Sequence, residues 1–363
     1  MRLTLLIIAL CTCSGLFAQK DTLQSRIILV GDAGALVNGR SAVIDAIKSQ
    51  MKLDKKTTVL FLGDNLYDIG LPDIYHRGYN EAKAALDSQV TVARGTDANV
   101  VIIPGNHDWN NAGPGGEEAI RRQQQYVDFS GEKNVQFFPK DGCPGPVEIK
   151  ISDDVVMIVM DSQWWLHPFE KPGVESDCDQ KTPEQVLSEL DDLLNKNLNK
   201  LVIFACHHPF KSNGVHGGYF TWKQHLFPFT EMRQNLYIPL PVVGSIYPIA
   251  RSVFGTPQDI PHPRYQNMIA SLNEVLKVHP HIVRVHGHEH NLQWIQNDSL
   301  VQLITGSGCK TSRVSDGKDT RYTARNLGFA VMEVSTNKRA KATFYEMDAD
   351  LDSAKEAFSG EVM

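Results

Sequence analysis

Seven short apolar runs recur along the chain, and each is followed by residues that suit the binding of a metal or a phosphate. The runs and their following residues are RIILV before Gly31-Asp32, VLFL before Gly63-Asp64, VVIIP before Gly105-Asn106-His107, VVMIVM before Asp161, LVIFAC before His207, HIVRV before His286-Gly287-His288, and LVQLIT before Gly306. Such runs are typical of buried strands that are covered on both faces. Ligand sites in open α/β sheets lie at the carboxyl ends of the strands, so we expect these polar residues to converge.

Helices are predicted between the strands, where a sheet covered on both faces requires them. The predicted ranges are 41–51, 81–89, 182–198 and 265–278. The third range opens with Thr182-Pro183-Glu184-Gln185, which combines a capping box with proline at the first helical position. Strands that alternate with helices in this way predict an α/β fold.

A long segment from about 210 to 263 interrupts this alternation, because it contains seven prolines and many aromatic residues with little periodicity. It is predicted to be an inserted loop. Long irregular loops in compact domains are often functional, so a lid or recognition surface is one interpretation and a self-packed excursion is the other. Its stretch 236–250 is apolar but too short to span a bilayer, so membrane contact through the insertion would be limited to the surface.

The composition is that of a globular protein: 363 residues, 42% hydrophobic and 21% charged, are enough for a substantial core. The net charge of −6 provides no broad basic surface, which argues against nucleic acid as a partner. Residues 1–18 have the pattern of a signal peptide, with Arg2, an apolar stretch from Leu3 to Leu10 and a cleavage site ending at Ala18. A buried first strand is the alternative. The signal predicts export to the periplasm, the cell surface or the medium, and no transmembrane helix is expected in the mature chain.

Four cysteines would remain after removal of the signal, in a compartment that permits disulfides. Cys143 and Cys178 lie in loop-like sequence on either side of the 155–160 strand, and they form the favoured pair. Cys206 ends an apolar strand and is interpreted as a buried thiol. Cys309 is the fourth, and three pairings of the four are possible.

The residues at the strand ends form a set of ligands suited to a pair of metal ions. Two metals that hold both the attacking and the departing oxygen of a phosphoryl group need carboxylates, a bridging ligand and imidazoles. Asp32 and Asp64 supply carboxylates, the Asn106-His107 pair supplies an amide oxygen and an imidazole, and His288 and His290 supply two more imidazoles. A single Asp after a strand is more often a helix cap or a turn residue, so the prediction rests on the whole set.

As a set, these motifs resemble the calcineurin-like metallophosphoesterases, and within them the purple acid phosphatases, closest to the small tartrate-resistant acid phosphatase type. The resemblance is carried by Tyr67 in GDNLY, by His207-His208-Pro209 and by the run from Gly287 to Gln293. It spans about Arg26 to Val334. It implies two packed mixed β-sheets flanked by helices in a four-layer sandwich, with a catalytic domain over 22–348 and a C-terminal tail over 349–363.

The resemblance also implies which residues hold a dinuclear metal centre. Asp32, Asp64, Tyr67 and His290 would bind the first metal, Asp64, Asn106, His207 and His288 the second, and Asp64 would bridge. A tyrosinate favours Fe(III) at the first site, while the second could take Fe, Zn or Mn. Core packing is the alternative for Tyr67.

Two further histidines, His107 and His216, would act on the substrate as catalytic residues. The implied reaction is hydrolysis of phosphate monoesters by attack of a metal-bound hydroxide, with a small phosphorylated molecule or a phosphoprotein as substrate. Protonation of the leaving group by His107 would explain an acidic optimum. The alternatives are a phosphodiesterase or nucleotide phosphatase on the same centre and a non-catalytic, metal-dependent binding protein. His208 occupies a position where the small enzymes carry an aromatic residue, so the resemblance does not define which substrate is bound.

Overall fold

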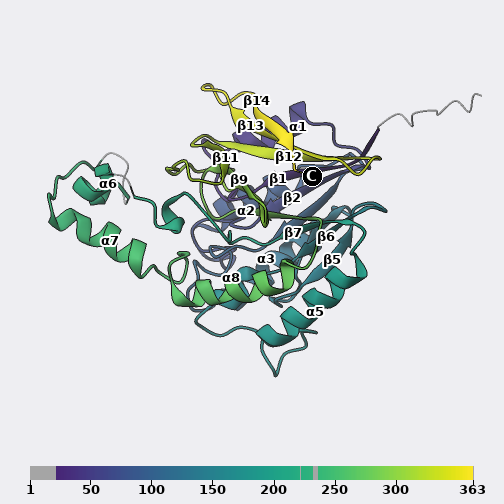
Figure 1. Ribbon diagram of the computed structural model, residues 1–363, viewed down its shortest axis with the longest axis horizontal. Helices are drawn as coiled ribbons and strands as arrows, with labels where there is room; N and C mark the ends of the chain where they lie inside the picture. Colours follow the sequence, from purple (N-terminus) through teal and green to yellow (C-terminus); the bar gives the residue numbers. More distant parts are fainter. Residues whose placement is uncertain (1–21, 221, 232–235, 363) are drawn as a thin grey trace, which may run out of the picture.

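Two seven-stranded β-sheets pack face to face, and helices cover their outer faces (Figure 1). The computed structural model describes residues 22–220, 222–231 and 236–362. The predicted signal peptide over 1–18 lies outside these residues. The predicted α/β fold with two packed mixed sheets is confirmed.

The first sheet has the strand order β14-β13-β12-β1-β2-β3-β4. Its four strands β1 to β4 are parallel, and β12, β13 and β14 extend the sheet antiparallel beyond β1. The strands are β1 (Leu23–Val30), β2 (Thr57–Leu62), β3 (Asn99–Ile103), β4 (Val135–Phe137), β12 (Gly328–Ser335), β13 (Ala340–Met347) and β14 (Ala354–Glu361).

The second sheet has the order β11-β9-β10-β8-β7-β6-β5. Strands β6, β7, β8 and β10 are parallel, whereas β5, β9 and β11 are antiparallel to their neighbours. The strands are β5 (Val147–Lys150), β6 (Val155–Val159), β7 (Leu201–Ala205), β8 (Ile282–His286), β9 (Leu292–Asn297), β10 (Leu300–Thr305) and β11 (Thr320–Ala324).

Alternate residues of each central strand serve two different apolar cores. In β1, Ile27 and Leu29 pack between the two sheets, whereas Ile28 and Val30 pack under the outer helices. Successive side chains of a strand point to opposite faces, and here both faces are covered. This is why the central strands appear in the sequence as continuous apolar runs.

The helices of the body are α1 (Ala42–Gln50), α2 (Tyr79–Val90), α3 (Gly116–Asp128), α4 (Ser162–Leu166), α5 (Pro183–Lys196) and α8 (Pro263–Leu276). Four of them, α1, α2, α5 and α8, confirm the predicted helices. The Thr182 side chain accepts a hydrogen bond from the Gln185 backbone and caps α5, with Pro183 at the first helical position. Helix α8 begins at Pro263, two residues before the predicted start, and α3 and α4 were not predicted.

The insertion is more regular than the predicted loop. It contains η1 (Val215–Gly217), α6 (Trp222–Leu226), η2 (Pro228–Glu231), η3 (Val243–Ser245) and α7 (Ile246–Val253). We call the described residues between 219 and 254 the arm. In Figure 1, α6 and α7 project from the body of the molecule, and the chain after α7 returns to the body before α8.

The prediction of a C-terminal tail over 349–363 was wrong for residues 354–361. They form β14, which pairs antiparallel with β13 along its length. The segment AKEAFSGE contains few apolar residues because an edge strand has one neighbour and is half exposed.

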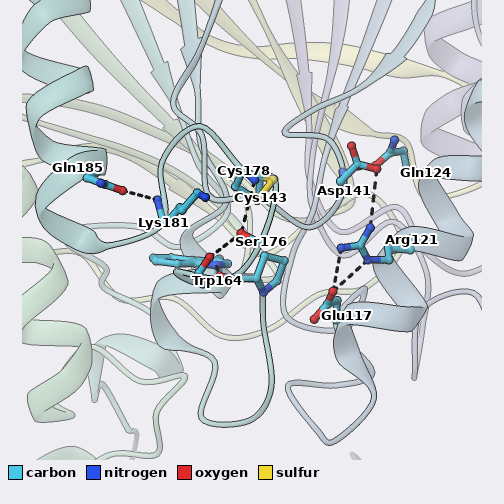
Figure 2. The surroundings of a disulfide bond; sticks show 12 residues. Glu117, Arg121, Gln124, Asp141, Cys143, Trp164, Ser176, Cys178, Lys181 and Gln185 are labelled. Atoms are coloured by element: carbon cyan, nitrogen blue, oxygen red, sulfur yellow. Dashed lines mark hydrogen bonds and ion pairs between the residues drawn. A yellow bond between two sulfur atoms is a disulfide. The ribbon is translucent and has the colours of Figure 1, made fainter.

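The predicted disulfide between Cys143 and Cys178 is formed, with the two Cα atoms 5.6 Å apart. It joins the loop after β4 to the loop before α5 (Figure 2). Cys206 is a buried free thiol, as predicted, and Cys309 is free and half-buried. Within the described part of the chain, the structure contains no helix that combines the length and the apolar character needed to cross a bilayer.

Candidate metal centre

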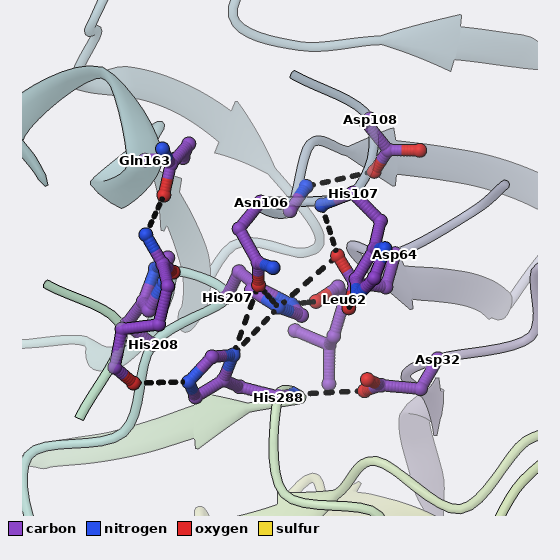
Figure 3. Close-up of polar contacts among 12 residues, drawn as sticks. Asp32, Leu62, Asp64, Asn106, His107, Asp108, Gln163, His207, His208 and His288 are labelled. Carbon is purple, nitrogen blue, oxygen red and sulfur yellow. Dashed lines mark hydrogen bonds and ion pairs between the residues drawn. The ribbon is translucent and has the colours of Figure 1, made fainter. Parts of the chain in front are cut away.

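All seven predicted metal ligands lie together at the carboxyl ends of five parallel strands. Figure 3 labels five of them: Asp32, Asp64, Asn106, His207 and His288. Asp32 follows β1, Asp64 and Tyr67 follow β2, Asn106 follows β3, His207 follows β7, and His288 and His290 follow β8. The first three strands belong to one sheet and the last two to the other. Asp161 follows β6 but caps α4 and accepts a hydrogen bond from Trp109 instead.

The first group of donor atoms surrounds the hydroxyl of Tyr67. This oxygen lies 2.9 Å from Asp32 Oδ1, 3.2 Å from Asp64 Oδ2 and 3.1 Å from His290 Nε2. His290 Nε2 also lies 3.3 Å from Asp32 Oδ1. Two carboxylates, a phenol and an imidazole therefore converge within the reach of a single cation.

The second group surrounds the amide oxygen of Asn106. This oxygen, Asn106 Oδ1, lies 3.1 Å from His207 Nε2 and 3.0 Å from His288 Nδ1, and these two nitrogens are 3.2 Å apart. Asp64 Oδ1 lies 3.4 Å from His207 Nε2. Asp64 thus contributes one carboxylate oxygen to each group, which is the arrangement that a bridging ligand requires.

The hydrogen bonds outside the second group show that it suits a cation. The far nitrogens, His207 Nδ1 and His288 Nε2, lie 2.7 and 2.8 Å from the carbonyl oxygens of Leu62 and Gln258. A carbonyl only accepts, so each of these nitrogens carries a proton and the other nitrogen of the same ring faces Asn106 Oδ1. Once His207 gives up its second proton, three lone pairs converge at this point. Oxygen and imidazole donors held in this way fit iron, zinc or manganese.

His208 lies against this group but is not available as a ligand. Its Nδ1 is 2.8 Å from the hydroxyl of Ser162, and its Nε2 is 2.7 Å from Oε1 of Gln258. Both ring nitrogens are therefore occupied. Burial, together with the neighbouring His207, holds the pKa of His208 well below its usual value, so the ring is neutral. His208 supports the position of Gln258 rather than binding a metal.

The charges of the centre depend on one another. Burial alone would raise the pKa of Asp64, but His207 and His107 outweigh it and hold that pKa well below its usual range. Burial alone would lower the pKa of His207, but Asp64 outweighs it and raises the pKa to about 9. Burial and then Asp32 raise the pKa of Tyr67 well above its usual value. Cation binding would therefore displace protons from His207 and Tyr67.

The backbone of three ligands adopts the left-handed conformation, which is uncommon for residues other than glycine. The φ angles are 57° at Asp32, 52° at Asp64 and 69° at His288. A Cβ on Gly287 would lie 2.7 Å from Asp32 Oδ2, closer than a side chain permits. Glycine at position 287 therefore permits the close approach of the loop after β8 to Asp32. The strained backbone of the ligands left no signal in the sequence.

Asp108 organises the loops that carry these ligands and was not predicted. Its buried carboxylate accepts hydrogen bonds from the backbone nitrogens of Gly105, Asn65 and Leu66, at 2.8, 3.2 and 3.1 Å. Burial and then Asp64 raise its pKa to about 7. Its position directly after Asn106-His107 was the available signal.

His107 lies beside the ligands with one ring nitrogen free. Its Nδ1 donates to the carbonyl oxygen of Asp68 at 2.7 Å, and its Nε2 lies 4.0 Å from Asp64 Oδ2. The side chain is 20% exposed, so a substrate can reach it. Its backbone nitrogen donates to Asp64 Oδ1 at 2.9 Å. The position fits the predicted role of acting on the substrate rather than on the metals.

His216, the second predicted catalytic residue, lies against the ligand His288, with the two ring centroids 4.0 Å apart. Its Nδ1 is 2.8 Å from Asp259 Oδ1, and Arg251 of α7 binds the same carboxylate through Nη2 at 2.8 Å and Nε at 3.0 Å. The insertion thus reaches the centre by two routes, through Asp259 and through the Gln258 carbonyl. Sequence analysis did not identify Arg251, Gln258 or Asp259, because no periodic pattern in the insertion indicates what contacts His216.

The fold and the two donor groups define a class of metal-dependent phosphoesterase. Residues 25–234 match the family model described as calcineurin-like phosphoesterase, and the chain belongs to this family.

The fold is also similar to two solved structures. One is GAP50, the anchor in the inner membrane complex of Plasmodium, with 17% identity, a TM-score of 0.55 and coverage of 94% of this chain and 89% of that one. The other is the purple acid phosphatase PPD1 from yellow lupin (Lupinus luteus) seeds, with 11% identity, a TM-score of 0.52 and coverage of 93% of this chain and 53% of that one. At these identities the similarity concerns the fold alone. A search of curated proteins gave no match.

Proposed function

We propose that this protein is an exported acid phosphatase that hydrolyses phosphate monoesters at a dinuclear metal centre of the purple acid phosphatase kind. The observation that carries the proposal is the pair of donor groups that share Asp64, with His107 beside Asp64 and His216 beside His288. When bound, two metals would neutralise the phosphate oxygens and activate a water for in-line attack.

Tyr67 makes Fe(III) the proposed first metal, because a phenolate surrounded by carboxylates is a hard donor set. The second group, with two imidazoles and an amide oxygen, would take Fe, Zn or Mn. This assignment would give the protein a visible colour from charge transfer between Tyr67 and the iron.

His107 and His216 have different proposed roles in catalysis. With Nδ1–H held by the Asp68 carbonyl, His107 in its cationic form carries its second proton on Nε2 and passes it to the leaving alkoxide. His216, with Nδ1 held by Asp259, presents Nε2 to a phosphate oxygen. Because His107 must be protonated and the ligand imidazoles must be free of a proton on the donor atom, activity should peak on the acid side of neutrality.

The substrate is proposed to be a small phosphorylated molecule or a phosphoprotein. The experiment measures phosphate release from an aryl phosphate monoester, an aryl phosphodiester and a nucleoside monophosphate against pH, with iron-loaded protein. Monoester turnover at acid pH that falls by about a hundredfold or more in His107→Ala supports the proposal. His281→Ala is the matched control, since this exposed histidine lies at the opposite end of β8 and should leave turnover unchanged.

Two outcomes would replace the proposal. Faster turnover of the diester than of the monoester would make the protein a phosphodiesterase. Two bound metals without turnover of any substrate would favour a binding protein on the same scaffold, and the structurally similar GAP50 is described as an anchor.

Export is part of the proposal and has its own test. The Cys143–Cys178 disulfide supports an oxidising compartment, since such bonds are rare in the cytosol. Cell fractionation with a C-terminal epitope tag should place the protein outside the cytoplasm, with Gln19 near the new N-terminus. A cytoplasmic protein that retains residues 1–18 would contradict it.

A further inference from the structure

Helix α7 in the arm exposes its apolar side chains and turns its polar side chains toward the body. Ile246, Ile249 and Val253 share one face at helical spacing, and they are 66%, 54% and 58% exposed. On the other side of the helix, Arg251 binds Asp259 and the Ser252 hydroxyl donates to the Gly218 carbonyl at 2.8 Å. A surface helix normally has the opposite arrangement.

The rest of the arm extends this apolar surface. Eleven of the twenty large hydrophobic side chains that are exposed in the described residues lie between 219 and 254. Those with the highest exposure outside α7 are Val242 at 86%, Phe254 at 71% and Trp222 at 68%. Isolated exposed apolar residues are ordinary, but a concentration on one projecting element marks a surface that binds something.

The charge of the arm favours an anionic surface. The sequence 222–254 contains Lys223 and Arg233 against a single acidic residue, Glu231, in a chain whose net charge is −6, and its third cation, Arg251, is paired with Asp259. No acidic residue occurs in 236–254. The arm would therefore approach an anionic surface with less repulsion than the rest of the protein.

The chemistry and shape of the arm favour lipid over a protein groove. Trp222, Tyr237 and Tyr247 accompany branched aliphatic side chains, the mixture found where helices lie in the interface of a membrane. Helix α7 has eight residues and cannot cross a bilayer, but it can lie in its surface. The arm projects from the body (Figure 1). To bury its apolar face in a partner protein it would need a groove of matching shape, whereas a bilayer can accommodate it without one.

We propose that the arm docks this protein on the surface of a bilayer that contains anionic phospholipid, with the outer face of α7 and the Val242-Val243 turn inserted among the lipids. This proposal does not depend on the proposed phosphatase activity. Arg251 on the inner face of the same helix keeps its contact with Asp259, so docking and the metal centre use opposite sides of α7.

The test is cosedimentation of the purified full chain with vesicles of phosphatidylcholine, with and without phosphatidylglycerol. The arm variant Ile246→Asn/Ile249→Asn/Val253→Asn should bind the anionic vesicles at least about tenfold more weakly than the wild type. The matched control is Ile74→Asn/Phe129→Asn/Val278→Asn, which changes three side chains of similar exposure, 61%, 86% and 58%, outside the arm. It should bind as the wild type does. All three proteins carry the same residues 1–21, so binding through that segment would not distinguish them.

Tryptophan fluorescence reports on the arm directly. Of the five tryptophans, Trp109, Trp164, Trp165 and Trp294 are buried in the body, and Trp222 is exposed in the arm. Anionic vesicles should shift the emission to shorter wavelength, and the shift should disappear in Trp222→Phe while sedimentation persists.

Three results would overturn the proposal. The wild type fails to bind anionic vesicles, or the arm variant and the control bind equally well. Alternatively, the wild type forms a dimer in sedimentation velocity that the arm variant abolishes, without vesicle binding, in which case a second copy of the chain covers the arm. Circular dichroism melts of each variant exclude misfolding as the cause, since all the changed side chains are exposed.

Discussion

Replacing Asp259 by asparagine should separate the contribution of the insertion to stability from its contribution to catalysis. The carboxylate is 1% exposed and accepts hydrogen bonds from His216, from Arg251 and from the backbone and hydroxyl of Thr256, all between 2.8 and 3.0 Å. Asp259→Asn preserves the shape of the side chain but removes its negative charge. The new NH2 group then faces the donors whose hydrogen bonds the carboxylate oxygen accepted. His216 would lose the partner that fixes its ring.

The expected loss of stability in Asp259→Asn follows from the burial of the ion pair between Asp259 and Arg251. Removing one partner of a fully buried ion pair costs about 3–5 kcal/mol. Arg251 remains 16% exposed, so water compensates part of its charge, and we expect Asp259→Asn to lower the free energy of unfolding by about 2–3 kcal/mol. Urea denaturation at pH 7 measures this loss.

The pH dependence of that loss has a defined sign. Burial alone would raise the pKa of Asp259, but His216 and Arg251 outweigh it and hold the pKa well below its usual value. A carboxyl whose folded pKa is depressed stabilises the fold above its unfolded pKa of about 3.9 and loses this contribution as the pH falls toward the folded pKa. The difference between wild type and variant should therefore shrink as the pH falls below about 4.

The effect on catalysis should follow from the position of His216. Loss of its orientation should lower kcat/KM for an aryl phosphate by about tenfold to a hundredfold. In a His216→Ala background the same Asp259→Asn change should have little further effect on kcat/KM, because the group that it positions is gone. Arg251→Gln is the control, since it breaks the ion pair but leaves the bond between Asp259 and His216. It should lose comparable stability with less than about a threefold loss in kcat/KM.

Two results would refute this reasoning. One is an Asp259→Asn variant that keeps its kcat/KM while folded. The other is a loss of kcat/KM in Arg251→Gln as large as in Asp259→Asn, which would mean that stability alone controls both.

Three further predictions concern the metals, the disulfide and acid stability. Tyr67→Phe should abolish the visible absorption band of iron-loaded protein while retaining bound iron above half of the wild-type content by elemental analysis, and a band that persists would exclude Tyr67 as an iron ligand. Cys143→Ser/Cys178→Ser should lower the free energy of unfolding by about 2–4 kcal/mol, because the bond closes a loop with a sequence separation of 35, and reductant should destabilise the wild type but not the variant. Burial lowers the pKa of His167 to about 4. His167 of the unfolded chain therefore binds a proton at a higher pH than His167 of the folded protein. As the pH drops from about 6.5 toward 4, the free energy of unfolding should fall by about 2–3 kcal/mol. Urea denaturation at several pH values should show a smaller decrease for His167→Gln.

The sequence was sufficient to predict the central strands and the gathering of the candidate ligands at the strand ends, because both follow from local patterns. A parallel strand buried on both faces is a continuous apolar run, and a residue directly after it lies at the edge where ligands gather. Asp32, Asp64 and Asn106 could be identified in this way without knowing the strand order. The family resemblance implied a substrate-side role for His216, and the structure places its ring against that of His288.

The sequence was insufficient where structure depends on long-range pairing. Strand β14 is polar and half-exposed, and only its pairing with β13 makes it a strand. Helix α3 begins after Gly115 in the left-handed conformation, without a capping side chain, so no start signal was present. Asp259 lies 43 residues from His216, and nothing local indicates that the two meet. The contacts of the insertion with the site, through Gln258 and Asp259, were therefore missed by sequence analysis.

The candidate ligands come from both sheets, which would make metal affinity a measure of tertiary order. Asp32, Asp64 and Asn106 follow strands of one sheet, while His207 and His288 follow strands of the other. A compact state that kept its strands but loosened the packing between the sheets would separate the donors and release the metals. Bound metal would in turn hold the two sheets together at one edge. Metal loss during gradual denaturation should therefore precede the loss of the far-ultraviolet signal, and chelators should weaken the contact between the sheets before they affect either sheet itself.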